Sequence, residues 1–279
     1  MTPSYVDAHA HLTDGRFAAD LADVLARAAA AGVTRILTCG EDVASSERAL
    51  ALAASAPIVR VAVGIHPHRA ASCDAAALER LRALAADPRV VAIGEIGIDR
   101  SGRSAPLADQ ERAFAAQLAL AAALDLPVVV HVRDAGDDAR RIIDAVNDRL
   151  ARDARTTGRE ATASHAAPRV RGQLHCYSEG PDEVAGWLAR GLHLSFSGTL
   201  TSPGSDALRA AARLVPADRL LAETDAPYLT PQAVRGKRNE PAFVAHTVAV
   251  LAAERGAEGD ALAAQLAANA ASLFGSRWG

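Results

Sequence analysis

Short runs of apolar, β-branched residues alternate along the chain with longer stretches in which apolar residues recur every three or four positions. The short runs are typical of buried strands, and the longer stretches are typical of amphipathic helices. Eight strands are predicted, each followed by a helix. They cover residues 5–9, 34–40, 58–67, 90–99, 127–134, 172–178, 193–198 and 219–227.

Repeated strand–helix units predict a parallel sheet, and eight such units predict a closed (β/α)₈ TIM barrel. We expect one domain over residues 1–279. A doubly wound open sheet is the alternative. Residues 154–172 are rich in Arg, Thr and Gly and predict a mobile loop on the bottom face of the barrel, opposite the face that carries active sites in this fold.

Composition narrows the class of protein. Half of the 279 residues are hydrophobic, which is enough for a large core, and the net charge of −3 argues against strong non-specific binding of nucleic acid. The three cysteines are widely spaced and predict neither a disulfide framework nor a zinc finger. The N-terminus does not resemble a signal peptide, and no apolar run is long enough to span a membrane. We therefore expect a cytoplasmic protein without membrane partners.

Six metal-ligand residue types fall at the ends of predicted strands. Because the carboxyl ends of barrel strands meet at one rim, we expect these side chains to converge. Imidazole suits zinc, and carboxylates suit magnesium or manganese. Six ligands exceed the need of one tetrahedral ion, so two divalent metal ions are expected, bridged by Glu95. The expected ligands are His9, His11, Glu95, His131, His175 and Asp225.

The other histidines receive different interpretations. His66 and His68 follow the third strand on the functional rim, and His66 is the better candidate for a substrate contact. His165 falls in the bottom loop, His193 begins the seventh strand, and His246 lies in a helical pattern. We expect these last three to be structural or solvated.

With these motifs in place, the chain resembles the TatD family of metal-dependent hydrolases, also called TatD-type deoxyribonucleases. The resemblance covers the chain from its first strand to its end. It implies a TIM barrel whose divalent metal centre hydrolyses phosphodiester bonds in DNA. The matching stretches are VDAHAHL, VGIHPH, IGEIGID, HVRDA, LHCYS, LLAETDAPYLTP, KRNEP and NAASLFG.

The resemblance also implies how the ligands divide. It assigns Glu95 as the bridge, with His9, His11 and Asp225 for one ion and His131 and His175 for the other. Two positions on the functional face depart from the family pattern: Arg100 stands where an aromatic residue is usual, and Glu179 where glycine is usual. Both departures bear on substrate preference.

The expected reaction is hydrolysis by metal-activated water, with Glu95 and Asp225 as catalytic residues and Asp225 as the proton acceptor. Arg133, Lys237 and Arg238 are expected to hold phosphate oxygens, since Arg offers a forked donor and Lys a point charge. The expected partner is DNA, as single-stranded ends or short nucleotides that can enter the barrel mouth. A 3′–5′ exodeoxyribonuclease is the expected form of this activity.

Two other functions remain open from the sequence. A small-molecule amidohydrolase or lactonase could use the same dinuclear centre, although Lys237 is the only lysine and the fourth strand offers Glu95 rather than a lysine as bridge. A non-enzymatic protein that retains the fold is the other alternative, and the complete ligand set argues against it.

Overall fold

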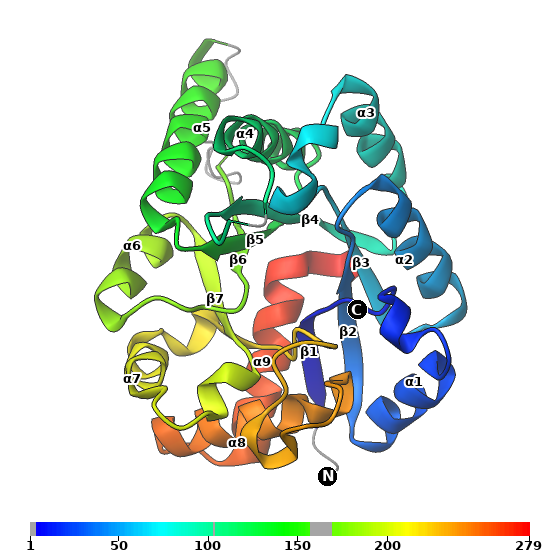
Figure 1. The fold of residues 1–279 in the computed structure, drawn as a ribbon. Helices are drawn as coiled ribbons and strands as arrows, with labels where there is room; N and C mark the ends of the chain where they lie inside the picture. The colour runs from blue at the N-terminus through cyan, green and yellow to red at the C-terminus, as the bar shows by residue number, and fades with distance from the viewer. Residues whose placement is uncertain (1–3, 103, 157–168) are drawn as a thin grey trace.

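The computed structural model describes residues 4–102, 104–156 and 169–279. Its strands form one parallel sheet in sequence order, and the helices surround the sheet on the outside (Figure 1). The strands are β1 (Tyr5–Ala10), β2 (Val33–Cys39), β3 (Val59–Val63), β4 (Val90–Asp99), β5 (Val128–Arg133), β6 (Gly172–Leu174), β7 (Leu192–Phe196) and β8 (Leu220–Ala222). The α-helices are α1 (Leu21–Ala30), α2 (Val43–Ser55), α3 (Ala75–Leu84), α4 (Leu107–Ala123), α5 (Gly136–Thr156), α6 (Val184–Ala189), α7 (Asp206–Leu214), α8 (Val244–Arg255) and α9 (Gly259–Phe274).

The barrel closes where the segment after β8 meets β1. Ala10 and Ala226 form a parallel bridge, and the amide of His11 donates to the Ala226 carbonyl at 2.7 Å. The amide of Asp225 donates to the His9 carbonyl at 3.0 Å. The TIM-barrel prediction is confirmed, and the open-sheet alternative is wrong.

Local sequence explains where several helices begin and end. Asp42 caps α2 by accepting from the Ser45 amide, and the Ser45 hydroxyl accepts in turn from the Asp42 amide, which completes a capping box. Asp74 caps α3 in the simpler way, through the Ala77 amide at 2.8 Å. Gly256 ends α8 with a φ of 61°, a left-handed conformation that glycine adopts without a steric penalty.

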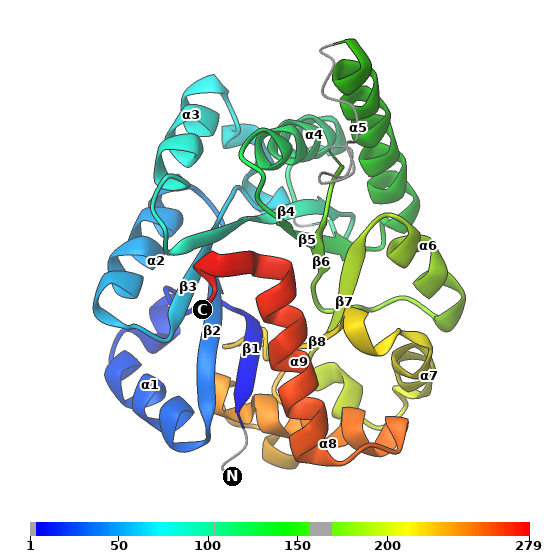
Figure 2. The same cartoon turned by 180° about the vertical axis from the view of Figure 1, so that it is seen from behind.

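Helix α9 covers the end of the barrel at which the strands begin (Figure 2). Its residues Ala270, Leu273 and Phe274, together with Trp278, pack against side chains inside the barrel such as Leu37. The rings of Phe274 and Trp278 lie 4.8 Å apart and are both buried. This apolar floor closes one end of the barrel, so the opposite end is the one that can admit a ligand.

The structure differs from the prediction in the lengths of strands β6 and β8 and at the start of the predicted loop 154–172. Strands β6 and β8 are only three residues long, so His175 and Asp225 lie in the loops just beyond them. Residues 154–156 are the last of α5, and residues 157–168 of the predicted bottom loop lie outside the described residues. No helix in the described parts of the chain is both long and apolar enough to cross a membrane.

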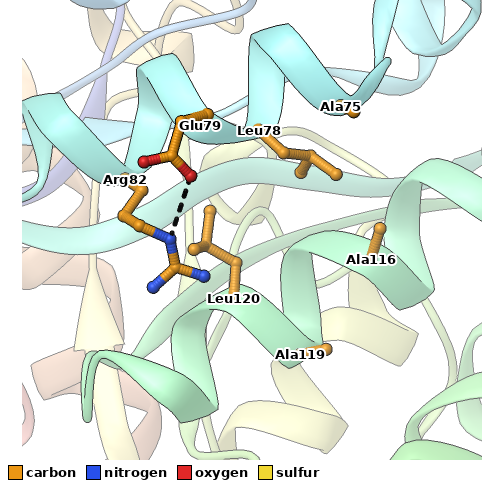
Figure 3. A pocket seen from close by; sticks show the side chains of 7 residues that line it. All are labelled: Ala75, Leu78, Glu79, Arg82, Ala116, Ala119 and Leu120. Atoms are coloured by element: carbon orange, nitrogen blue, oxygen red, sulfur yellow. Dashed lines mark ion pairs between the residues drawn. The ribbon is translucent and has the colours of Figure 1, made fainter.

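A groove runs between α3 and α4 on the outer helical layer (Figure 3). It is lined by Leu78, Glu79 and Arg82 of α3 and by Ala116, Ala119 and Leu120 of α4. Its two charged side chains, Glu79 and Arg82, form an ion pair with each other at 3.5 Å. The remaining walls are alanine and leucine, so the groove offers no group suited to hydrolysis.

Candidate metal centre

The six predicted ligands meet at the mouth of the barrel, where the strands end. His9 and Glu95 lie within β1 and β4, and His131 lies within β5. His11, His175 and Asp225 follow the last residues of β1, β6 and β8, in the order given. All are buried except His131, which is partly exposed.

Glu95 lies between two groups of histidines, and each of its carboxylate oxygens faces one group. Oε2 lies 3.4 Å from Nε2 of His9 and 3.3 Å from Nε2 of His11. Oε1 lies 2.9 Å from Nδ1 of His131 and 2.8 Å from Nε2 of His175. This arrangement suits a carboxylate that bridges two cations.

Asp225 completes the first group. Its Oδ1 lies 3.5 Å from Nε2 of both His9 and His11, and those two nitrogens lie 3.1 Å from each other. The ligand atoms of several sets of three residues lie within 4.8 Å of one another: His9, His11 and Asp225; His9, Glu95 and His175; His66, Glu95 and His131. Ring nitrogens that face one another across carboxylate oxygens are a donor set for divalent ions such as zinc.

His66 belongs to this cluster but differs from the other histidines in its hydrogen bonds. Its Nδ1 accepts from the His68 amide at 3.1 Å, so in the neutral ring Nε2 must carry the proton. Nε2 lies 3.4 Å from Oε1 of Glu95. Burial lowers the pKa of His66 to about 4, against an opposing effect of Glu95, so the ring is neutral at pH 7. His66 is therefore placed as a hydrogen-bond donor rather than as a metal ligand.

Glycines let the strand that carries Glu95 pack tightly against β5. A Cβ added at Gly94 would lie 2.6 Å from Cβ of Val129. A Cβ added at Gly97, where φ is 149°, would lie 1.9 Å from the His131 carbonyl oxygen. The close approach of the two strands brings Glu95 and His131 into contact.

Three side chains behind the ligands were not identified from the sequence. Oε1 of Glu223 lies 3.3 Å from Nδ1 of His175 and accepts from the Cys176 amide at 2.7 Å. Oδ2 of Asp99 lies 3.3 Å from Nε2 of His131. Sγ of Cys39 lies 3.4 Å from Nδ1 of His9. Partners of this kind fix the orientation and tautomer of a ligating imidazole.

A second set of polar residues holds the turn that carries Asp225. Asp7 is fully buried and accepts from the amide and the hydroxyl of Thr224, at 2.8 and 2.6 Å. Nδ2 of Asn239 donates to the carbonyls of Thr224 and Tyr228, at 2.8 and 2.5 Å. The only signal for Asp7 in the sequence is its charge inside an apolar strand.

The carboxylates of the centre are held in their ionised form. Burial alone would raise the pKa of Glu95, but the neighbouring His175, His66 and His9 outweigh it and hold the pKa well below its usual range. The pKa of Asp225 is lowered against the same effect of burial, mainly by its hydrogen bond with His11. Two negative charges in a buried site attract cations.

In the metal-free protein, protonated histidines neutralise part of this negative charge. Burial opposes the cationic form of His11, but Asp225 and Glu95 outweigh it and raise its pKa to about 9. The pKa of His175 is raised well above its usual range in the same way, by Glu95 and Glu223. A metal ion that binds these rings must therefore displace protons.

The predicted phosphate contacts separate into two kinds. Arg133 and Lys237 are exposed and form no ion pair with any residue in the described ranges. Arg238 instead pairs with Asp20 at 2.7 Å, and its guanidinium lies 4.6 Å from the centre of the Phe17 ring. The structure thus leaves Arg133 and Lys237 available to an anion and engages Arg238 within the fold.

Both departures from the family pattern form ion pairs. Arg100 pairs with Asp138 at 2.6 Å. Glu179 pairs with Arg140 at 3.2 Å and accepts a hydrogen bond from Nε1 of Trp187. The pairing with Arg140 reduces the repulsion that Glu179 would exert on a passing polyanion.

The histidines expected to be structural lie away from the centre where they are described. His193 is buried in β7, and burial together with Arg219 lowers its pKa to about 4. His246 lies in α8, with its ring 6.0 Å from that of Phe243. His165 lies outside the described residues.

The chain is similar to known proteins over nearly its whole length. Residues 6–275 match the family model described as TatD related DNase. The chain is 35% identical over 274 residues to the 3′-5′ ssDNA/RNA exonuclease TatD of Escherichia fergusonii, covering 96% of this chain and 98% of that protein. It is 38% identical over 269 residues to the protein of the same name in Cronobacter turicensis, covering 95% of each.

A solved structure is similar throughout. The crystal structure of YJJV, a TatD homologue from Escherichia coli K12, matches with a TM-score of 0.85 and 30% sequence identity, over 98% of this chain and 99% of that chain. The sequence motifs, the barrel and the cluster at its mouth agree with this match. The chain therefore belongs to the family of TatD related DNases.

Proposed function

We propose that the protein is a divalent-metal-dependent exonuclease that removes nucleotides from the 3′ ends of single-stranded DNA. Two of its relatives carry names that describe a 3′-5′ exonuclease acting on single-stranded DNA and RNA. The observation that carries the proposal is the position of Glu95, whose two oxygens face two separate groups of histidines. A carboxylate in this position could hold two ions side by side, and two such ions stabilise both the attacking and the leaving oxygen of a phosphodiester.

The residues fit two divalent ions. Oε2 of Glu95 and Nδ1 of His11 are buried and have no hydrogen-bond partner among the described residues. We assign His9, His11 and Asp225 to one ion, His131 and His175 to the second, and Glu95 to both. The mixed donor set suits zinc, manganese or magnesium. Bound there, such ions would polarise a phosphoryl oxygen and lower the pKa of the attacking water.

Two side chains of the chain act directly on the substrate in this proposal. Asp225 is the proton acceptor, because its lowered pKa keeps it ionised at neutral pH and its Oδ1 lies 3.5 Å from Nε2 of both His9 and His11, within the group of residues assigned to the first ion. His66 donates its Nε2 proton to a phosphate oxygen, because its Nδ1 already accepts from the backbone. The histidines assigned to the ions, His9, His11, His131 and His175, serve to hold the ions in place.

Single-stranded ends are the proposed substrate because the ligands are recessed. Glu95 and His9 are almost fully buried. Arg133 and Lys237 supply the nearby cationic contacts, and each phosphate engaged on a single strand contributes roughly 0.7 to the slope of log affinity against log salt. With so few contacts, the salt dependence of binding should be shallow.

We also propose a cytoplasmic location. Cys39, Cys73 and Cys176 are all unpaired thiols. Free cysteines are typical of proteins in a reducing compartment.

The test compares substrates with the metal-loaded protein. We expect degradation of single-stranded oligonucleotides from a free 3′ end, little degradation when that end is blocked, and slow degradation of matched duplexes. Glu95→Gln serves as the inactive control. Efficient cutting of closed circular duplex would contradict the end-restricted action. Hydrolysis of lactones or amides by a protein that cleaves no nucleic acid would assign the centre to small molecules.

A further inference from the structure

The turn that carries the ligand Asp225 also carries an exposed aromatic ring. The amide of Tyr228 donates to the carbonyl of Asp225 at 2.9 Å, so the two residues share one tight turn. The Tyr228 ring lies edge-on to the ring of His11, with 6.0 Å between their centres and 82° between their planes. Tyr228 therefore lies directly beside the first group of ligands.

This ring is unusual in a chain with few aromatic residues. Only 4% of the residues are Phe, Trp or Tyr. In the described part of the chain, the exposed large hydrophobic residues are Leu214 at 59%, Tyr228 at 42% and Leu229 at 37%. Two of them are adjacent, and these two are at the rim of the candidate metal centre. Exposed apolar surface beside a polar site is typical of a ligand contact.

The ring is also held in place before any ligand binds. The backbone carbonyl of Tyr228 accepts from Nδ2 of Asn239, and the Tyr228 hydroxyl donates to Oδ2 of Asp14 at 3.3 Å. The guanidinium of Arg16, which is paired with Asp14, lies over one face of the ring, 4.0 Å from its centre, so a base would have to stack on the opposite face. The carbonyl oxygen of Leu229 lies 2.1 Å from where a Cβ of residue 198 would be, a close approach that only glycine permits at Gly198. A pre-ordered ring loses little entropy on binding.

We propose that Tyr228 is a stacking platform for the nucleobase at the cleaved end of the strand, which adds a base subsite to the metal centre. This inference rests on the proposed nuclease function. A flat aromatic face is sequence-tolerant, because every nucleobase has a π-face. The platform thus requires that a base be present without selecting which base it is. Leu229 extends the apolar surface next to it.

The experiment compares two oligonucleotides that differ in the base of the 3′-terminal nucleotide. One carries a normal base and the other an abasic residue with the same phosphate. Tyr228→Ala should raise KM for the normal oligonucleotide roughly tenfold or more and leave KM for the abasic one unchanged. Tyr228→Phe keeps the ring and should retain the discrimination between the two. Leu214→Ala removes an exposed apolar side chain far from the centre and is the matched control.

A binding measurement separates this proposal from the proposed function. An oligonucleotide with 2-aminopurine at a nuclease-resistant 3′ end should lose fluorescence on binding to the wild type, and this loss should be absent with Tyr228→Ala at saturating protein. Cleavage by the wild type with equal quenching in both proteins would overturn the platform and leave the nuclease function standing. Equal losses on both oligonucleotides in Tyr228→Ala would also overturn it. Neither cleavage nor binding of any oligonucleotide would overturn both.

Discussion

The two ends of the barrel differ in the kind of side chain that they bury. At the floor, Phe274 and Trp278 fill the space between the strands with apolar side chains, and both are almost fully buried. At the mouth, buried polar atoms of His11, Glu95 and Glu223 have no hydrogen-bond partner among the described residues. Buried unpaired polar atoms destabilise a fold, whereas buried aromatic rings stabilise it. The floor maintains the fold, and the mouth is arranged for ions and substrate.

Among substitutions at the two ends of the barrel, the largest effect on activity is expected for Glu95→Gln at the mouth. The amide keeps the shape of the side chain but cannot serve both groups of ligands as a charged bridge, so kcat/KM should fall by about 1000-fold or more. The measurements are initial rates on a single-stranded oligonucleotide and metal content by mass spectrometry.

The matched control is His193→Gln, which alters a buried histidine near the start of β7, at the floor end of the barrel. This variant should retain its metal and most of its activity. If Glu95→Gln and His193→Gln lost activity and metal to the same extent, the two ends of the barrel would not differ in function.

At the floor, Phe274→Ala is expected to affect folding instead of chemistry. The cavity left by the ring should lower the free energy of unfolding by about 3–5 kcal/mol. The protein that remains folded should keep its metal content and its kcat, as measured by urea unfolding and by rates corrected for the folded fraction. Exposed Leu214→Ala should change stability by about 0.5 kcal/mol or less. A variant with intact stability and lost activity would show that the floor acts on the centre.

A smaller effect is expected for Glu223→Gln. The amide oxygen can still accept from the Cys176 amide, but the charge that orients His175 is lost. Metal affinity should fall roughly 10- to 100-fold, with recovery of kcat at saturating metal. Isothermal titration with the metal measures the first effect. The exposed carboxylate of Glu258 provides the control, as Glu258→Gln. A loss of kcat that saturating metal does not restore would place Glu223 in the reaction itself.

The last effect concerns pH. The folded pKa of His11 is about 9, above its usual 6.5, so its contribution to stability in the metal-free protein is present below pH 6.5 and is lost as the pH rises toward 9. Metal binding requires the neutral ring, so it strengthens over the same range, by at most about 1.4 kcal/mol per pH unit for each proton displaced.

The difference in Tm between metal-loaded and chelated protein should therefore widen from pH 6.5 to pH 9. Differential scanning fluorimetry with and without a chelator measures this difference. The variant His193→Gln should show the same widening, because it lies outside the centre. A constant difference would mean that the metal does not compete with protons at His11.

The sequence predicts the barrel and the convergence of the six candidate ligands at one rim for the same reason. Alternating strands and helices set the topology, and the topology brings strand ends such as those near His9 and His131 to one rim. His175 and Asp225 also lie at this rim, although the strands before them, β6 and β8, are only three residues long.

What the sequence does not reveal depends on contacts between distant segments. Arg238 is the residue type expected of a phosphate contact, but it pairs with Asp20, which is 218 residues away in the chain. Glu223 looks like part of the motif that carries Asp225, yet it faces His175 on the opposite group of ligands. Hydrogen-bond partners of this kind depend on side-chain positions that no local pattern encodes.

The junction between the first strand and the segment after the last one has a consequence for the kinetics of folding. The same few residues that close the barrel, through the bonds of His9 with Asp225 and of His11 with Ala226, also place the first group of candidate ligands. Closing so long a loop is slow compared with forming local helices. A metal-sensitive dye in a refolding experiment would therefore time the final closure of the barrel, after the helical signal in circular dichroism has already developed.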